Sequence, residues 1–183
     1  MNKIIQADLY RYGGLSGIKG LLKGLMIPGF RYMYCMRKAS EGSRYSLKRI
    51  FFSLLKQRYS YKYGFQIPTP TQIGEGFYIG HFGTVVINTR ARIGKNCNIA
   101  HNVTIGQANR GKLEGYPTIG DNVWIGTGSV IVGNIKIGSN VLIAPNSFVN
   151  VDVPDFSLVL GNPCKIVSKE NPTDGYINNI LPS

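Results

Sequence analysis

The sequence predicts a mainly β protein, in which a parallel β-solenoid follows an N-terminal α-helical segment. Three observations support this fold class. Isoleucine recurs every six residues over most of the C-terminal two thirds of the 183-residue chain. Glycine and asparagine, which suit tight turns, stand between these isoleucines. The first third has apolar residues at helical spacing and carries most of the positive charge.

The repeat starts at Ile67 and ends at Val149. Its thirteen large positions are 67, 73, 79, 87, 93, 99, 105, 119, 125, 131, 137, 143 and 149, and all but the last are isoleucine. A small or β-branched residue lies two positions earlier in most units, namely Thr71, Val85, Ala91, Cys97, Val103, Val123, Ser129, Val141 and Ser147. This period fits neither an α-helix nor a hairpin meander. It fits short strands that each send one large and one small side chain inward, so that isoleucines stack into an apolar ladder.

The period breaks twice. From Ile79 to Ile87 there are eight residues, so two extra residues fall within 80–84. From Ile105 to Ile119 there are fourteen, and the polar, glycine-rich stretch 107–117 is expected to leave the solenoid as an excursion loop. Loops on a rigid scaffold often carry function.

The two histidines of the chain, His81 and His101, each lie two residues after a repeat isoleucine. If three units make one turn, Ile79 and Ile99 stack, and the histidines project from the same side on adjacent levels. Both breaks are expected at that same spot, which favours a functional site. A zinc site would need a third ligand, and no Cys or acid stands at a supporting spacing, so no metal is expected.

These residues resemble the hexapeptide-repeat acyltransferases, which are left-handed parallel β-helix enzymes that use acetyl-CoA. The segment 78–87, Tyr-Ile-Gly-His-Phe-Gly-Thr-Val-Val-Ile, is similar to the serine-acetyltransferase branch, whose catalytic histidine occupies the same insertion. The segment 100–106 is similar to acetyltransferases of surface-polysaccharide gene clusters, and 153–155 and 161–166 resemble the closing segment of the family. The resemblance covers about residues 65–167 and implies a homotrimer with active sites between subunits.

The resemblance implies roles for individual residues. His81 is expected to be the general base, because imidazole can take a proton from a hydroxyl near neutral pH. Three roles stay open for His101: orienting the acceptor, contacting His81, or acting as the base. The residues expected to contact acetyl-CoA or to stabilise the oxyanion are Gly106, Lys112, Gly126, Thr127, Ala144, Pro145 and Lys165.

The chain also departs from the serine-acetyltransferase pattern. Gln66 and Gly80 stand where that branch has acids, and Tyr116 stands where it has a histidine. Gln66 and Tyr116 are therefore the expected substrate-contacting positions, and their identities count against serine as the acceptor.

The basic charge belongs to the first third of the chain. Residues 1–62 hold 13 Lys and Arg against 2 acids, a balance of +11, whereas residues 63–183 are close to neutral. The repeat carries no excess of basic side chains, so nucleic acid is not an expected partner. Helices are expected around 15–26 and 46–58, with Pro28 ending the first. Two compatible roles are capping the open end of the solenoid and contacting an anionic inner membrane.

The three cysteines are odd in number and scattered, which favours a reducing, cytoplasmic setting. No secretory signal or membrane-spanning run is recognised. We divide the chain into a helical segment, 1–62, a β-helix domain, 63–167, and a tail, 168–183.

The leading hypothesis is an acetyl-CoA-dependent O-acetyltransferase that modifies a sugar hydroxyl in surface-polysaccharide biosynthesis, with direct transfer and a histidine base. Serine O-acetylation in cysteine biosynthesis is the second hypothesis, and amino-sugar N-acetylation is the third. The acceptor is thus a small molecule or a glycan. A solenoid scaffold at the membrane surface is the alternative outside the enzymes.

Overall fold

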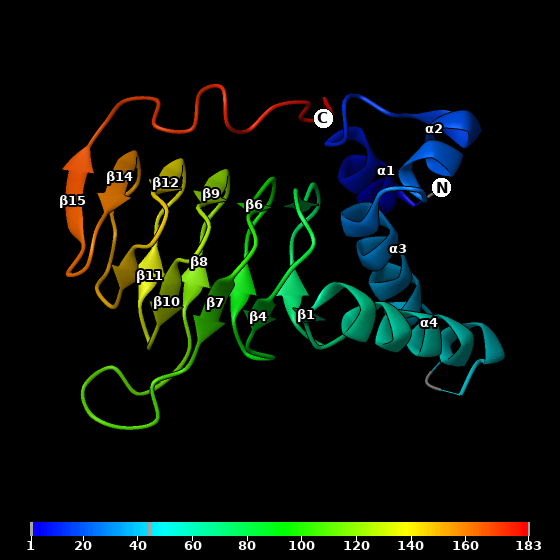
Figure 1. Cartoon of the computed structure of the whole chain (residues 1–183), viewed down its shortest axis with the longest axis horizontal. Helices are drawn as coiled ribbons and strands as arrows, with labels where there is room; N and C mark the ends of the chain where they lie inside the picture. Colours follow the sequence, from blue (N-terminus) through cyan, green and yellow to red (C-terminus); the bar gives the residue numbers. More distant parts are fainter. Residues whose placement is uncertain (1, 44, 183) are drawn as a thin grey trace.

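Three flat walls of parallel strands form a left-handed β-helix, which four α-helices precede (Figure 1). The computed structural model describes residues 2–43 and 45–182. The helices are α1 (Lys3–Tyr10), α2 (Gly17–Gly24), α3 (Pro28–Ser40) and α4 (Leu47–Tyr63). The strands are β1 (Phe65–Gln66), β2 (Gln72–Ile73), β3 (Tyr78–Ile79), β4 (Val85–Ile87), β5 (Arg92–Ile93), β6 (Asn98–Ile99), β7 (Val103–Gly106), β8 (Thr118–Ile119), β9 (Val123–Ile125), β10 (Val130–Val132), β11 (Lys136–Ile137), β12 (Val141–Ile143), β13 (Phe148–Val149), β14 (Ser157–Leu160) and β15 (Lys165–Ser168).

From β1 to β13, every third strand belongs to the same wall. Wall A has the order β1-β4-β7-β10-β13, wall B has β2-β5-β8-β11, and wall C has β3-β6-β9-β12-β14-β15. All neighbours are parallel except β14 and β15, which are antiparallel. Up to β13, consecutive strands along the chain therefore lie on successive walls, as a solenoid requires, whereas β14 and β15 both join wall C.

The strand register shows how the helix accommodates both breaks. Ile119 pairs with Ile137, 18 residues later, which is the undisturbed turn of three six-residue units. The turn from Ile79 to Ile99 takes 20 residues, and the turn from Ile99 to Ile125 takes 26. The extra residues leave the register intact, because they bulge outward at corners between walls.

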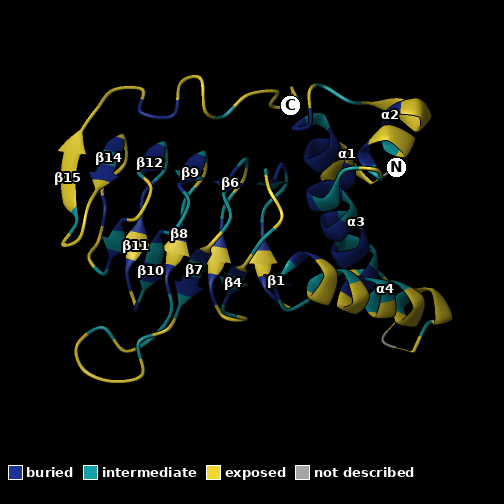
Figure 2. Ribbon diagram, viewed as in Figure 1, coloured by how far each residue is buried: buried dark blue, intermediate teal, exposed yellow. Residues whose placement is uncertain are grey.

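The inward positions of the repeat fill the core, which confirms the predicted fold. All thirteen large positions are 9% exposed or less, and so are the nine small positions that precede them. Full burial of an isoleucine side chain stabilises a fold by about 1.5–3 kcal/mol, so the ladder supplies most of the driving force. Figure 2 shows these buried residues in dark blue along the strands of the solenoid.

The helical segment covers the first turn of the solenoid. Asp8 of α1 is 1% exposed and accepts hydrogen bonds from Arg37 of α3, at 2.9 Å to Nε, and from the backbone N–H of Phe77, at 2.9 Å. Arg37 also donates to the carbonyls of Ile73 and Gly74. These bonds satisfy backbone groups that the open end of the solenoid would otherwise expose.

The helix boundaries differ from the expected ones. Pro28 does not end the first helix: α2 ends at Gly24, and Pro28 is the first residue of α3, where a missing backbone N–H costs nothing. The apolar stripes of α2 and α4 are largely exposed rather than packed on the solenoid (Figure 2). In the described part of the chain, no helix is long and apolar enough to cross a bilayer.

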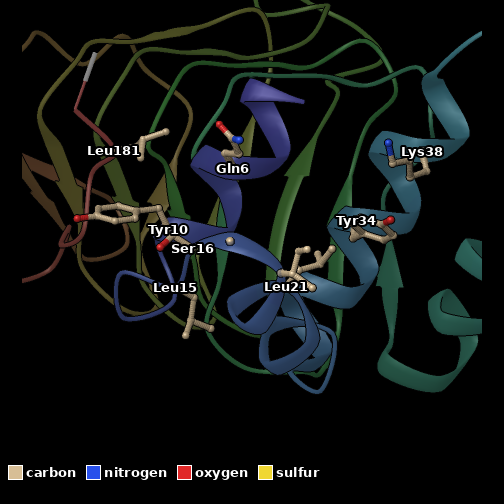
Figure 3. A pocket seen from close by; sticks show the side chains of 10 residues that line it. Gln6, Tyr10, Leu15, Ser16, Leu21, Tyr34, Lys38 and Leu181 are labelled. Carbon is tan, nitrogen blue, oxygen red and sulfur yellow. The ribbon is translucent and has the colours of Figure 1, made fainter. Parts of the chain in front are cut away.

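The C-terminal tail returns along wall C to the helices (Figure 1). The Tyr176 ring contacts the Trp124 ring in a tilted arrangement with centroids 4.8 Å apart, and the Tyr176 carbonyl accepts a hydrogen bond from the Asn98 side chain at 2.8 Å. Further along, Leu181 lines a cavity of about 530 Å³ together with Tyr10 of α1 and Leu21 of α2 (Figure 3). The tail therefore links the last turn of the solenoid to the helical segment.

Candidate active site

One corner of the β-helix, between walls C and A, holds both histidines. The stacked isoleucines of wall C are each followed two positions later by a residue at this corner, and these residues are His81, His101, Thr127 and Pro145. We call this the histidine corner. The sequence spacing therefore places both imidazoles on adjacent levels of one edge.

The two imidazoles contact each other. Their ring centroids are 5.9 Å apart and their planes meet at 88°, an edge-to-face arrangement. His81 is exposed, whereas His101 is half-buried. The Nδ1 atom of His101 is buried and has no hydrogen-bond partner among the described residues. The pair thus combines an accessible ring with a more enclosed one.

The two-residue insertion positions His81. Gly83 has φ of +138°, and an added Cβ there would lie 3.1 Å from the Cβ of His101, so the insertion closes directly over the second histidine. The N–H of Gly83 donates to the carbonyl of Tyr63 at 2.9 Å, next to Gly64, whose φ of +78° ends α4. The end of α4 therefore anchors the loop that carries His81.

Residues of the next level of the corner form hydrogen bonds with the backbone of His101. Its carbonyl accepts hydrogen bonds from Thr127 Oγ1 at 2.9 Å and from the N–H of Gly128 at 3.3 Å. Gly126 lies against the following turn: an added Cβ would stand 2.6 Å from the nitrogen of Pro145. Thr127, Gly126, Ala144 and Pro145 thus lie at or beside the histidine corner.

Other expected site residues lie at a different corner. Strand β7 begins two residues after His101, crosses wall A and ends at Gly106, and the loop with Lys112 and Tyr116 follows it. These three residues therefore lie at the opposite edge of wall A from His101. The expectation that both breaks converge on one spot is wrong within a single subunit. Because a strand rises about 3.3 Å per residue, Gly106 is on the order of 15 Å along the chain from His101.

Tyr116 has a partner that the sequence did not reveal. Arg90 donates from Nη1 to Tyr116 Oη at 3.1 Å, and its guanidinium lies 5.3 Å from the centre of the tyrosine ring. The two residues line a polar cavity of about 540 Å³ between walls A and B. Arg90 carries no motif signal, since arginine in a solenoid turn is usually only solvated.

Two expected site residues stand apart from both corners. Gln66 is exposed on the outer face of wall A, level with Val86 of β4, and lines a cavity of about 820 Å³ with Lys56 of α4. Lys165 is exposed on β15, at the opposite end of the solenoid from the helices (Figure 1). Among the residues that the structure describes, no group of three or more His, Cys, Asp or Glu side chains could hold a metal ion.

Comparison with known proteins agrees with this architecture. The family described as "Bacterial transferase hexapeptide (six repeats)" matches residues 116–150. Serine acetyltransferase of Staphylococcus epidermidis is 44% identical over 107 residues, which is 58% of this chain and 50% of that protein. The chain spans between about a third and three fifths of the length of the curated relatives that it matches, from 32% to 57%.

Solved structures give the same result over more of the chain. Neisseria gonorrhoeae serine acetyltransferase in complex with serine is 32% identical, with a TM-score of 0.72 over 91% of this chain and 68% of that one. Brucella abortus serine acetyltransferase in complex with coenzyme A is 26% identical, with a TM-score of 0.74 over 91% of this chain and 67% of that one. The fold and the repeat define a hexapeptide-repeat transferase. Within that family, the chain belongs to the serine-acetyltransferase-like branch.

These comparisons correct the leading functional hypothesis. A surface-polysaccharide acceptor was favoured because Gln66, Gly80 and Tyr116 depart from the serine-acetyltransferase pattern. That hypothesis is wrong, since both the curated relatives and the solved neighbours are serine acetyltransferases. The departures concern three positions, whereas the likeness extends over the whole β-helix.

Proposed function

We propose that this protein is an acetyl-CoA-dependent serine O-acetyltransferase. The observation that carries the proposal is the contact between His81 and His101, with ring centroids 5.9 Å apart, on an accessible corner of a serine-acetyltransferase-like β-helix. The solved neighbours in complex with serine and with coenzyme A support the choice of substrates.

His81 is the general base in this proposal. Its ring is exposed, so an acceptor hydroxyl can reach a ring nitrogen. As the serine oxygen bonds to the thioester carbon, the hydroxyl proton passes to His81, and the carbon–sulfur bond then breaks. His81 returns that proton to the departing sulfur, so no acyl-enzyme forms. Proton transfer of this kind contributes about 10²–10⁴-fold to a rate.

His101 is a positioning residue for His81. The edge-to-face contact restricts the His81 ring, and the chain has Gln66 and Gly80 where carboxylates would otherwise orient the base. The buried Nδ1 of His101 lacks a partner in the described structure, and an unpaired buried nitrogen costs about 1–3 kcal/mol. A polar group from the acceptor or a second subunit would remove that cost.

We propose a homotrimer with active sites between subunits. Wall A presents half-buried apolar side chains outward, including Val86, Val132 and Phe148. Wall B is polar and exposed, and the tail packs on wall C. Packing through wall A would bring the Gly106, Lys112 and Tyr116 corner of one copy to the histidine corner of another.

Acetyl-CoA supplies the acetyl group as a thioester, and the residues of the histidine corner fit its extended shape. Thr127, Ala144 and Pro145 continue the column below His101, and Lys165 lies further along the same axis. Lys165, and Lys112 from a neighbouring copy, are exposed cations suited to phosphate groups. Gly126 acts on this path by allowing two turns to approach closely.

Thiol release from acetyl-CoA tests the proposed reaction. The purified protein is mixed with acetyl-CoA and L-serine, and in parallel with L-alanine, which has the same backbone groups but no hydroxyl. We expect release with L-serine alone, together with O-acetylserine detected by mass spectrometry. Equal release with both amino acids, or none with L-serine, would overturn the proposal.

We further propose that residues 1–62 contact an anionic membrane surface. Ile18 and Leu22 of α2 and Met26 just after it are 63–80% exposed, and Leu47 and Leu54 lie on an exposed stripe on α4. Lysines and arginines flank both groups of apolar residues, and the whole segment has a balance of +11. Exposed apolar residues beside basic ones suit the interface of anionic lipids.

A further inference from the structure

Arg11, the residue that follows α1, is a buried cation held by neutral groups. The residue is only 4% exposed. Nε donates to the carbonyl of Asn178 at 2.8 Å, Nη1 to the carbonyl of Gly76 at 2.8 Å, and Nη2 to Asn98 Oδ1 at 2.6 Å. Within residues 2–43 and 45–182, no carboxylate lies within ion-pair distance of this guanidinium.

The charge of Arg11 is therefore not neutralised nearby. Asp8 of α1 lies three residues earlier, but its two oxygens are taken by Arg37 and the Phe77 N–H. Burial lowers the pKa of Arg11 from its ordinary value, although the group stays charged at neutral pH. A buried charge is costly without an opposite charge or a full set of hydrogen bonds. Three of the five N–H groups of Arg11 have partners, so two remain to donate.

A cavity of about 370 Å³ adjoins this guanidinium. Arg11 is its one charged lining residue, and the polar groups around it come from Tyr78, Asn98, Tyr176, Asn178 and Asn179. No acid lines the cavity. Its walls come from residues 11–13 after α1, from Ile27 before α3, from the first two turns of wall C and from the C-terminal tail. A basic, hydrogen-bonding cavity without acids fits a small anion.

We propose that this cavity binds a small oxyanion, a phosphate group or a carboxylate, held by the free N–H groups of Arg11 and the side-chain amide of Asn179. Such an anion would join the tail to β3 and to the segment that follows α1. Tyr78 and Asn98 line the cavity from the outer face of wall C, and no residue of the histidine corner lines it. The site is thus distinct from the proposed catalytic corner.

Thermal unfolding of the whole chain tests this site without any enzyme assay. The melting temperature is measured in chloride at fixed ionic strength, with inorganic phosphate or acetate added in turn. Binding to the folded state raises the melting temperature with the logarithm of anion concentration. A rise with phosphate alone indicates a phosphate group, and a rise with acetate alone indicates a carboxylate. No rise with either anion overturns the proposal.

Asn179→Asp provides the decisive variant, because it places a fixed carboxylate in the cavity without altering Arg11. Asn179 has φ of +54°, which aspartate also tolerates. We expect the variant to melt higher than wild type in chloride and to lose the response to anions. Asn171→Asp adds the same charge to an exposed tail position outside the cavity and should keep the response. An Asn179→Asp protein with the full wild-type response, or an Asn171→Asp protein without it, would show that the anion binds elsewhere.

Discussion

Replacing Gly126 by alanine tests whether close packing of two turns sets the shape of the histidine corner. An ideal Cβ at this position lies 2.6 Å from the nitrogen of Pro145 and 2.9 Å from the carbonyl oxygen of Ile143. Both are backbone atoms, so rotating a side chain cannot relieve the overlap. The turns must separate by several tenths of an ångström, which also stretches the 2.8 Å bond from the Gly126 N–H to the Ile143 carbonyl.

The expected cost follows from these contacts. Overpacking costs about 1–3 kcal/mol, and a weakened hydrogen bond adds about 1 kcal/mol. For a chain of this length, each kcal/mol lowers the melting temperature by about 2–4 °C, so Gly126→Ala should melt roughly 5–15 °C below wild type.

Gly106→Ala is the matched control for this experiment. A Cβ at Gly106 meets only side-chain atoms, of Val132 at 3.3 Å and of Thr104 at 3.6 Å, and Gly106 is not in the positive-φ region. Differential scanning calorimetry of both variants should show a small change for Gly106→Ala and a large one for Gly126→Ala. If Gly126→Ala melts within 1 °C of wild type (roughly 0.3–0.5 kcal/mol on the same scale), the turns do not constrain each other as described.

Three further predictions concern cysteines, the membrane and assembly. Burial raises the pKa of Cys35 to about 11 and of Cys97 to about 12. At pH 8 both should therefore stay thiols and react with a disulfide reagent only after denaturation. The half-buried Cys164 should react in the folded protein. Rapid reaction of all three thiols in the folded protein would contradict the buried packing of Cys35 and Cys97. The chain should co-sediment with anionic vesicles at low salt and not with neutral ones, and Leu54→Glu on α4 should weaken this; no binding to anionic vesicles ends the membrane proposal. Val132→Glu on wall A should convert a trimer to monomers in light scattering, and an unchanged trimer would move the interface to another wall.

The interior of the β-helix could be predicted from sequence because its rule is local. One large and one small residue per unit must point inward, so the identities at Ile99 and Cys97 already fix their burial. The helical segment obeys no such rule. The spacing of α2 and α4 predicted helices, but it could not say that Ile18 and Leu54 would face outward, and α1 and α3 were not recognised. Their docking depends on Asp8 and Arg37, which are far apart in sequence.

The candidate site was predictable to a similar extent. Counting units placed His81 and His101 on adjacent levels, because turn length follows from the repeat. The same counting failed for the loop after Gly106, because it ignored that β7 crosses the whole width of wall A. The path of the tail could not be foreseen, since the contacts of Tyr176 and Asn178 join residues that share no pattern. The acceptor was misjudged because three substituted positions outweighed the likeness of the whole repeat.

Steady-state acetyl transfer by His81→Ala tests the central claim most directly. Turnover is followed by thiol release with saturating acetyl-CoA and L-serine, and the melting temperature is recorded on the same sample. Because the His81 ring is exposed and no hydrogen bond of the fold depends on it in the described structure, the variant should keep its melting temperature and lose about 10²–10⁴-fold in kcat. A folded His81→Ala protein with near-wild-type turnover would show that the base lies elsewhere.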